Sequence, residues 1–181
     1  KAINGRIGKN NWYVITGGPC SGKTTVVNML GERGYKTTVE DARYYIDMQL
    51  ADGKTVEEIR KNQSEFQLKV LEIQIAQERS LSPEDVVFLD RAIPDALAYY
   101  RFLDLSPDRL LTDAMEHLSY KKIFILDPLP LIDDYARRED PAAQIKIHQL
   151  LREVYRSLPF PIVEVSVLPP AERVNLILTG I

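Results

Sequence analysis

The chain has 181 residues, 45% of them hydrophobic, which predicts one well-packed domain over residues 1–181. Its formal net charge of −3, with acidic and basic residues interspersed, argues against a nucleic-acid partner or an anionic membrane surface. The single cysteine, Cys20, excludes an internal disulfide and is typical of a reducing, cytoplasmic compartment. No apolar run approaches the roughly 20 residues that span a bilayer, and the first residues lack the apolar stretch of a signal peptide, so we expect a soluble protein.

One segment matches the phosphate-binding loop pattern at every position: glycine, four residues, glycine, lysine and then serine or threonine. Its residues, with the one that follows, are Gly17, Gly18, Pro19, Cys20, Ser21, Gly22, Lys23, Thr24 and Thr25. Residues 12–16 are typical of a buried strand and residues 24–30 of the apolar start of a helix, which is the context that the pattern requires.

The chemistry of this loop predicts a nucleoside triphosphate site. Its glycines let the backbone aim N–H groups inward, and the following helix presents its positive end to the phosphates. We expect Lys23 to reach the β and γ phosphates and Thr24 to hold a magnesium ion. Cys20 is interpreted as a small neutral side chain rather than a redox group.

Four further apolar runs predict strands, and helical segments separate them. The predicted strands are residues 12–16, 35–39, 86–89, 123–126 and 162–167. The third is continuously apolar, as expected of a strand that is covered on both faces. The predicted fold class is therefore α/β, with a five-stranded and mostly parallel sheet.

The helical segments have recognisable beginnings. A long insertion between the second and third strands opens with the capping pair Thr55 and Glu58. Ser106-Pro107 and Asp140-Pro141 each predict an N-cap followed by proline at the first helical position, for helices near 107–118 and 141–157. The insertion carries apolar residues along one face, which we interpret as core: Ile59, Phe66, Val70 and Ile73.

Charged residues follow the second and third predicted strands. Ligands of open α/β sheets bind outside the carboxyl ends of the strands, so we expect Glu40, Asp90 and the phosphate-binding loop to share one cleft. Asp90 is the candidate for a second magnesium contact; the alternative is a cap or an ion pair with Arg91. Arg91 either neutralises a transferring phosphoryl group or is structural.

A dense cluster of charges, DDYARRED, occupies residues 133–140. A charge run of this kind is usually a solvated loop. Because this one follows the fourth strand of a chain with a phosphate-binding loop, we favour a mobile lid over residues 127–140, whose Arg137 and Arg138 fold over the triphosphate.

Several segments together resemble the AAA-like P-loop ATPase family that includes the kinase domain of bifunctional ribosylnicotinamide kinases. They are the phosphate-binding loop, EDAR (40–43), VVFLDRAIPDALAYY (86–100), FILDPLP with DDYARRED, and VLPPAERVNLIL. The resemblance covers almost the full chain and implies a thymidylate-kinase-like three-layer α/β/α fold, with the loop strand central in a five-stranded parallel sheet. It also implies ATP rather than GTP. The family usually has glycine after Asp-Arg, whereas this chain has Ala92, which predicts a narrower acceptor pocket.

The resemblance also suggests roles near the second strand. In related small-molecule kinases the acid at a position similar to Glu40 is a general base on the acceptor hydroxyl; a hydrogen-bond clamp on the substrate is the alternative. Asp41 and Arg43 are candidates for the same pocket. Four tyrosines either stack on the acceptor or belong to the core: Tyr44, Tyr45, Tyr99 and Tyr100. His117 and His148 have no metal-ligand partners nearby in sequence and are assigned no chemistry.

Two functions from different classes fit this sequence. The first, which we favour, is a kinase that uses ATP and Mg²⁺ to phosphorylate a small nucleoside- or nucleotide-like acceptor. Its predicted catalytic residues are Lys23, Glu40, Arg91, Arg137 and Arg138. The second is a nucleotide-dependent switch or binding module, with slow hydrolysis and a protein partner. The sequence leaves the acceptor and the oligomeric state open.

Overall fold

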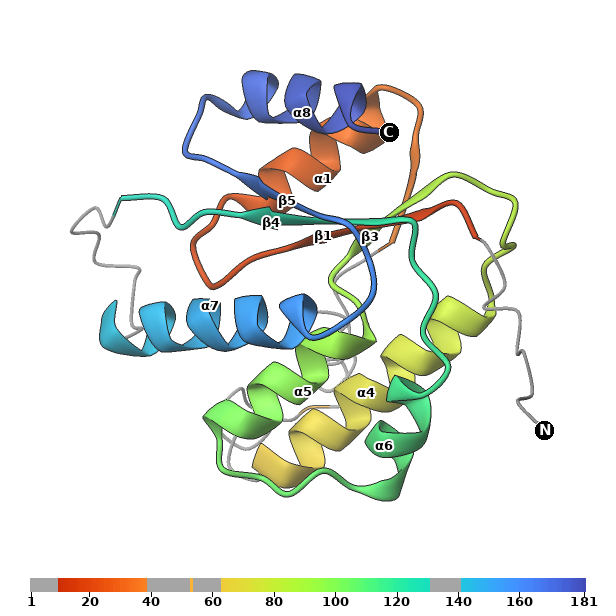
Figure 1. The fold of residues 1–181 in the computed structure, drawn as a ribbon, viewed down its shortest axis with the longest axis vertical. Coiled ribbons are helices and arrows are strands. Elements are labelled where there is room, and N and C mark those ends of the chain that lie inside the picture. Colours follow the sequence, from red (N-terminus) through yellow and green to blue (C-terminus); the bar gives the residue numbers. More distant parts are fainter. Residues whose placement is uncertain (1–9, 39–52, 54–62, 131–140) are drawn as a thin grey trace.

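A computed structural model describes residues 10–38, 53, 63–130 and 141–181. In this part of the chain a five-stranded sheet lies between two layers of helices (Figure 1). The strands are β1 (Trp12–Thr16), β2 (Lys36–Thr37), β3 (Val87–Asp90), β4 (Lys122–Leu126) and β5 (Ile162–Val165). The helices are α1 (Lys23–Glu32), α4 (Gln63–Arg79), α5 (Ile93–Phe102), α6 (Arg109–Met115), α7 (Pro141–Arg156) and α8 (Pro170–Thr179). The predicted α/β/α class is confirmed.

The strand order is β2-β3-β1-β4-β5, and every pair is parallel. The strand before the phosphate-binding loop is central, as the family resemblance implies: Val14 of β1 pairs with Leu89 of β3 on one side and Ile123 of β4 on the other. Parallel order brings the carboxyl ends of all five strands to one edge of the sheet. The loop after β1 and the end of β3 are therefore neighbours, with Ile15 opposite Asp90.

Each face of the sheet is covered by helices. In Figure 1, α1 and α8 lie on one face, and α7, α5 and α4 lie on the other. Successive residues of β1 pack into opposite layers: Tyr13 and Ile15 belong to the core under α1 and α8, whereas Val14 belongs to the core under α5 and α7. Burial on both faces explains why the three inner strands, β1, β3 and β4, are largely apolar.

Some element boundaries differ from the prediction. β2 has two residues rather than five, and β5 ends at Val165, so that Ser166 and Val167, which are exposed, lie beyond it. β3 begins one residue later than predicted and includes Asp90, which is buried.

The predicted start of α6 is wrong. Its N-cap is Asp108 rather than Ser106, because the Asp108 carboxylate accepts the Leu111 N–H at 2.9 Å and the Tyr100 hydroxyl at 2.7 Å. The predicted start of α7 is confirmed, with Pro141 as its first residue.

The core face of α4 was only partly predicted. Phe66 is buried as expected, but Val70 and Ile73 are half-buried. Leu71 and Ile75 are the other apolar residues of α4 in the core, and polar side chains share their face: Gln67, Gln74 and Glu78. The spacing of apolar residues does not identify the buried face of a helix correctly when polar residues are also buried on that face. None of the helices in the described ranges is both long and apolar enough to cross a membrane.

Candidate active site

The phosphate-binding loop joins β1 to α1 at the carboxyl edge of the sheet. Gly22 is the N-cap of α1 with a φ of 79°, a left-handed conformation that glycine adopts without strain. Lys23 is the first residue of the helix, and Thr24 follows it with an exposed side chain. The loop therefore presents the positive end of α1, with Lys23 and Thr24 beside it, at the edge where ligands of such sheets bind.

Lys23 and Asp90 form an ion pair next to the loop. The Lys23 Nζ donates to Asp90 Oδ1, and the two side chains are 5% and 6% exposed. The Asp90 backbone N–H donates to Thr38 Oγ1 at 2.9 Å, which fixes the end of β3 against the chain after β2. The structure thus brings Asp90 to the loop as predicted, and it gives Asp90 a lysine partner that the sequence did not indicate. Its carboxylate and the Thr24 hydroxyl are hard oxygen donors, the chemistry that suits Mg²⁺.

Arg91 leaves β3 in a left-handed conformation, with a φ of 68°. Its Nη1 donates to Asp95 Oδ2 at 2.8 Å, and its guanidinium lies 5.5 Å from the centre of the Tyr99 ring. The side chain is 13% exposed and lines a cavity beside the loop. Backbone strain of this kind is often stored at functional sites, because the surrounding structure must hold it in place.

Asp95 is a residue beside the loop to which the sequence reasoning gave no role. Its carboxylate accepts hydrogen bonds from Arg91, from the Thr16 hydroxyl at 2.7 Å and from the Tyr155 hydroxyl. It also accepts the Ala92 N–H at 3.3 Å. Asp95 therefore ties β1, α5 and α7 together and fixes the direction of the Arg91 side chain.

Ala92, where the family usually has glycine, is the N-cap of α5. Its φ of −144° is extended, so this position does not require glycine. The side chain is 2% exposed and lines the cavity, and the narrowing of an acceptor pocket by Ala92 stays a prediction.

A second buried carboxylate, Glu78, lies under the first turn of α5. It accepts the Tyr120 hydroxyl at 2.6 Å, a Gln74 amide N–H at 2.9 Å and the Ile93 N–H at 3.1 Å. Burial raises the pKa of Glu78 to about 7, although its hydrogen bonds oppose that shift. Glu78 thus holds a proton more tightly in the folded protein than in the unfolded chain.

This raised pKa predicts a pH-dependent stability. The free energy of unfolding should fall as the pH rises from 4.5, the ordinary Glu78 value, to about 7. Such a shift corresponds to about 3 kcal/mol. We expect Glu78→Gln to remove this loss, because the amide oxygen can accept the two N–H groups and the amide N–H can donate to Tyr120. Urea unfolding across this pH range, with the exposed Glu116→Gln as control, measures the difference; equal pH slopes in wild type and Glu78→Gln would contradict the assignment.

A cavity of about 490 Å³ opens from the loop toward α4 and α5. Aromatic and apolar side chains form much of its wall: Phe66, Val70, Leu71, Ala96, Tyr99, Phe102 and Leu103. Gln67 and Gln74 add amide groups, and Lys23 and Arg91 line the end nearest the loop. Gln67 is 8% exposed, yet its amide forms no hydrogen bond with any residue that the structure describes. The cavity therefore offers an apolar pocket with a polar edge next to a phosphate site.

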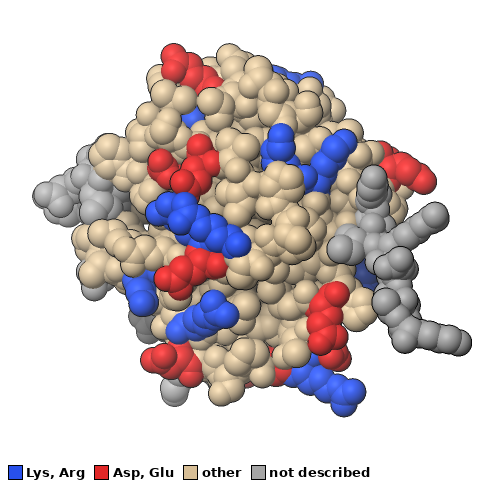
Figure 2. Space-filling view, viewed as in Figure 1, with Lys and Arg blue, Asp and Glu red and all other residues tan. Residues whose placement is uncertain are grey.

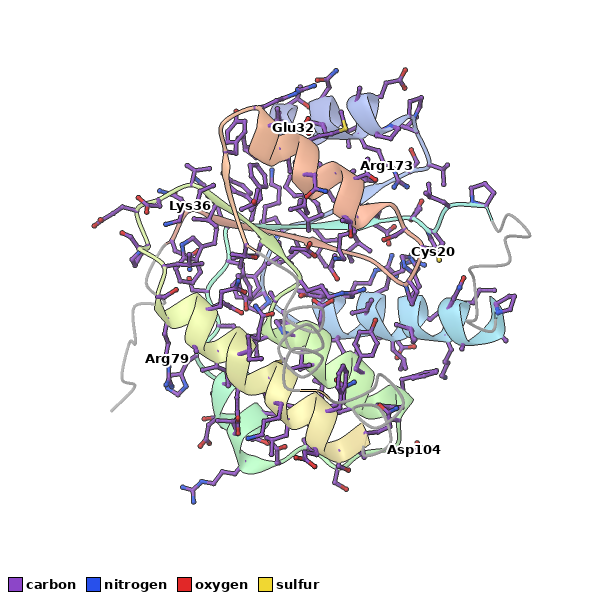
Figure 3. All side chains as sticks on the ribbon, turned by 180° about the vertical axis from the view of Figure 1, so that it is seen from behind. Cys20, Glu32, Lys36, Arg79, Asp104 and Arg173 are labelled. Atoms are coloured by element: carbon purple, nitrogen blue, oxygen red, sulfur yellow. The ribbon has the colours of Figure 1, made fainter. Side chains whose placement is uncertain are left out.

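Arg173 of α8 also supports the loop, and the sequence reasoning gave it no role. It is 1% exposed and donates to three backbone carbonyls: Ser166 at 3.0 Å, Asp127 at 2.8 Å and Ser21. Figure 3 shows Arg173 and Cys20 on the same side of the molecule. The Arg173 guanidinium thereby joins the loop to the chain segments that follow β4 and β5.

Several predicted residues lie outside the described part of the chain: Glu40, Asp41, Arg43, Tyr44, Tyr45, Thr55, Glu58, Ile59, Arg137 and Arg138. The beginning of the predicted lid is described, and the Leu129 N–H donates to the Cys20 carbonyl at 3.1 Å. Of the two described tyrosine candidates, Tyr99 lines the cavity and Tyr100 is 2% exposed within the core.

The charged side chains on the face shown in Figure 2 are interspersed, with Lys and Arg next to Asp and Glu. This matches the mixed charge pattern of the sequence.

Solved structures with the same fold are nucleotide- and nucleoside-related proteins. Deoxyadenosine kinase from M. mycoides with bound dATP has a TM-score of 0.60 at 16% identity, over 93% of this chain and 98% of that one. Thymidylate kinase from Candida albicans has a TM-score of 0.61 at 16% identity, over 95% of this chain and 91% of that one. The NadR protein in complex with NR has a TM-score of 0.67 at 18% identity; the match covers 97% of this chain and 53% of NadR.

A search of curated proteins found no sequence match. A family model described as an AAA domain matches residues 12–173. This match includes the phosphate-binding loop, the segment around Arg91 and Asp95, and the buried Arg173. Because it spans most of the chain, and because the fold is that of P-loop kinases, the chain belongs to this AAA-domain family of P-loop proteins.

Proposed function

We propose that the protein is a kinase that transfers the γ-phosphoryl group of ATP to a hydroxyl group of a small nucleoside- or nucleotide-like acceptor. The observation that carries this proposal is the cavity of about 490 Å³ that continues from the phosphate-binding loop to α4 and α5. A nucleotide-dependent switch has no need of an acceptor pocket at this place, whereas a kinase requires one. The similar folds with bound dATP and NR support this assignment.

The nucleotide would lie on the loop at the start of α1. Backbone N–H groups and the positive helix end stabilise the phosphates, and the Lys23 ammonium adds a full charge. Asp90 holds that ammonium at the loop in the described structure. Thr24 and Asp90 are the proposed ligands of Mg²⁺, which when bound neutralises phosphate charge.

In the transfer step the acceptor hydroxyl oxygen attacks the γ phosphorus, the bond to the β-phosphate oxygen breaks, and ADP leaves. Glu40 is the proposed base that takes the hydroxyl proton, and Arg137 and Arg138 are the proposed lid residues. Arg91 lines the cavity beside the loop and is held by Asp95, so its positive charge is positioned before the reaction begins. Preorganised charge of this kind stabilises the transition state without reorganisation.

The cavity wall supports an acceptor with a planar ring. The rings of Phe66, Tyr99 and Phe102 provide stacking surface, and the buried Gln67 amide provides a donor and an acceptor at the same wall. A ring with a hydrogen-bonding edge, such as a base or a pyridine amide, would satisfy that amide. We therefore place the ring of the acceptor against α4 and α5, and its hydroxyl group toward the loop.

This arrangement predicts that Gln67→Leu changes the KM for the acceptor and leaves the KM for ATP unchanged. A buried polar group left without its partner costs about 1–3 kcal/mol, so the KM for the acceptor should rise about tenfold or more. The KM for ATP should not change, because Gln67 belongs to α4 and not to the phosphate-binding loop. Steady-state kinetics measure the KM for the acceptor and the KM for ATP separately. Gln149→Leu on the exposed face of α7 is the matched control. Equal rises in the two KM values would refute this placement.

The acceptor itself is found by measuring ADP formation from ATP and Mg²⁺ with nucleosides, nucleoside monophosphates and ribosylnicotinamide in turn. The proposal predicts a large increase with one chemical class. A slow rate that no acceptor changes would instead support the switch function.

A further inference from the structure

One face of α7 lies directly against the phosphate-binding loop. The Gly18 N–H donates to His148 Nδ1 at 3.1 Å, and the Gln144 side-chain amide, one turn earlier, donates to Cys20 Sγ at 3.7 Å. The approach is close: a Cβ on Gly18 would lie 2.8 Å from the His148 Cβ and 3.3 Å from the Gln144 carbonyl oxygen. Gly18 therefore has to be glycine because α7 packs against its backbone.

We propose that His148 is a positioning residue for nucleotide binding, because its neutral imidazole holds the loop through the Gly18 N–H. This inference rests on the proposed ATP-binding function of the loop. The His148 contact fixes the second residue of the loop, so the direction of the following N–H groups depends on α7. The triphosphate would then meet a loop whose first turn is already in place, which lowers the ordering cost of binding.

The contact requires a particular form of the ring. Nδ1 accepts a hydrogen bond only when it carries no proton, so the ring proton must reside on Nε2. Protonation would place an N–H of the ring opposite the Gly18 N–H and break the contact. Nucleotide affinity should therefore be present at high pH and fall as the pH drops through the His148 pKa.

The surroundings of His148 favour its neutral form. Its side chain is buried, and this burial lowers the pKa of the imidazole below its ordinary value. The negative charges of Asp127 after β4 and Glu164 on β5 act in the opposite direction and raise the pKa of His148, while the positive charge of Arg152 on α7 adds to the lowering. The balance keeps Nδ1 available to Gly18 near neutral pH.

Two substitutions of His148 distinguish the effect of its hydrogen-bond acceptor from the effect of its size. In His148→Asn the amide oxygen can take the place of Nδ1 and does not titrate, whereas His148→Leu has no acceptor. We expect His148→Leu to bind ATP·Mg about tenfold more weakly than wild type at about pH 8. His148→Asn should bind close to wild type at that pH and lose less affinity than wild type as the pH falls.

The experiment is isothermal titration of ATP·Mg from about pH 5.5 to about pH 8.5, across the range where histidine titrates. At each pH the wild-type affinity is divided by the affinity of His148→Asn. This ratio removes the effect of protonation of the triphosphate, because that effect is the same for both proteins. The chain has two histidines, so His117→Asn is the matched control, with His117 exposed at the end of α6. Nitrogen NMR of His117→Asn without nucleotide reads the tautomer of His148, which should carry its proton on Nε2.

The outcomes are distinct. The inference predicts that the ratio falls at low pH and that His148→Asn rescues what His148→Leu loses. A ratio that is constant or rises at low pH, or His148→Leu binding as tightly as wild type, would overturn this inference alone. Wild-type protein that binds no ATP·Mg at any pH would overturn the proposed function together with it.

Discussion

Replacing Lys23 with methionine should lower the phosphoryl-transfer rate by roughly 10²–10³-fold or more, the usual effect of removing a preorganised charge from a reacting oxyanion. Lys23 is the first residue of α1 and lines the cavity at the loop, so its ammonium lies where the transferring phosphate would be. The affinity for ATP·Mg should fall as well, because the same charge binds the phosphates in the ground state. Steady-state kinetics and titration calorimetry measure the two effects.

The same substitution should also change stability, because Lys23 is paired with a buried Asp90. Breaking a buried ion pair by removing one partner costs about 3–5 kcal/mol, since the other charge stays buried. The double variant Lys23→Met with Asp90→Asn should regain much of that stability while remaining inactive. Lys36→Met is the matched control, because Lys36 forms a half-exposed ion pair with Asp85 at 3.4 Å, and surface pairs contribute about 0–1 kcal/mol. Full activity in Lys23→Met would be incompatible with the proposed site.

Arg173→Met should destabilise the fold by about 3–5 kcal/mol and weaken ATP·Mg binding. The guanidinium is buried and donates to the carbonyls of Ser21, Asp127 and Ser166, so methionine leaves all three carbonyls without this donor, and the Ser21 carbonyl is buried. Because Ser21 belongs to the phosphate-binding loop, loss of this contact should also loosen the loop.

Arg173→Lys should give an intermediate result, since a single ammonium replaces the planar group but cannot reach all three carbonyls at once. Arg156→Met is the control, as Arg156 is exposed at the end of α7 and bonds to Glu164 at 3.1 Å. Urea unfolding and ATP·Mg titration measure both consequences. If Arg173→Met were no less stable than Arg156→Met, the proposed support of the loop would be wrong.

The features that the sequence predicted best are those fixed by local pattern. The loop, β1, β4 and the start of α7 were placed correctly, because glycine spacing, apolar runs and a proline at N1 each act over a few residues. The predicted start of α6 was wrong because Ser106 and Asp108 are both residue types that cap helices. The hydrogen bond between Asp108 and Tyr100 favours Asp108 as the N-cap.

The supporting residues of the site were missed because their roles depend on distant contacts. His148 and Gly18 are 130 residues apart, and Arg173 and Ser21 are 152 apart. Asp95 lies in a segment that was recognised, but two of its four donors, Thr16 and Tyr155, are 79 and 60 residues away in the chain. Buried Gln67 and Glu78 interrupt the apolar face of α4, so hydrophobic periodicity predicted Phe66 correctly but not the buried Leu71 and Ile75.

The central claim is phosphoryl transfer from ATP on the loop to an acceptor in the adjoining cavity. The most direct test is to supply ATP labelled at the γ phosphorus together with Mg²⁺ and the acceptor panel, and to follow where the label goes. The account predicts that the label appears on one class of acceptor, with one ADP formed for each acceptor phosphorylated, and that Lys23→Met lowers the rate of transfer by roughly 10²–10³-fold or more. Label released only as inorganic phosphate, at a rate that no acceptor changes, would contradict it.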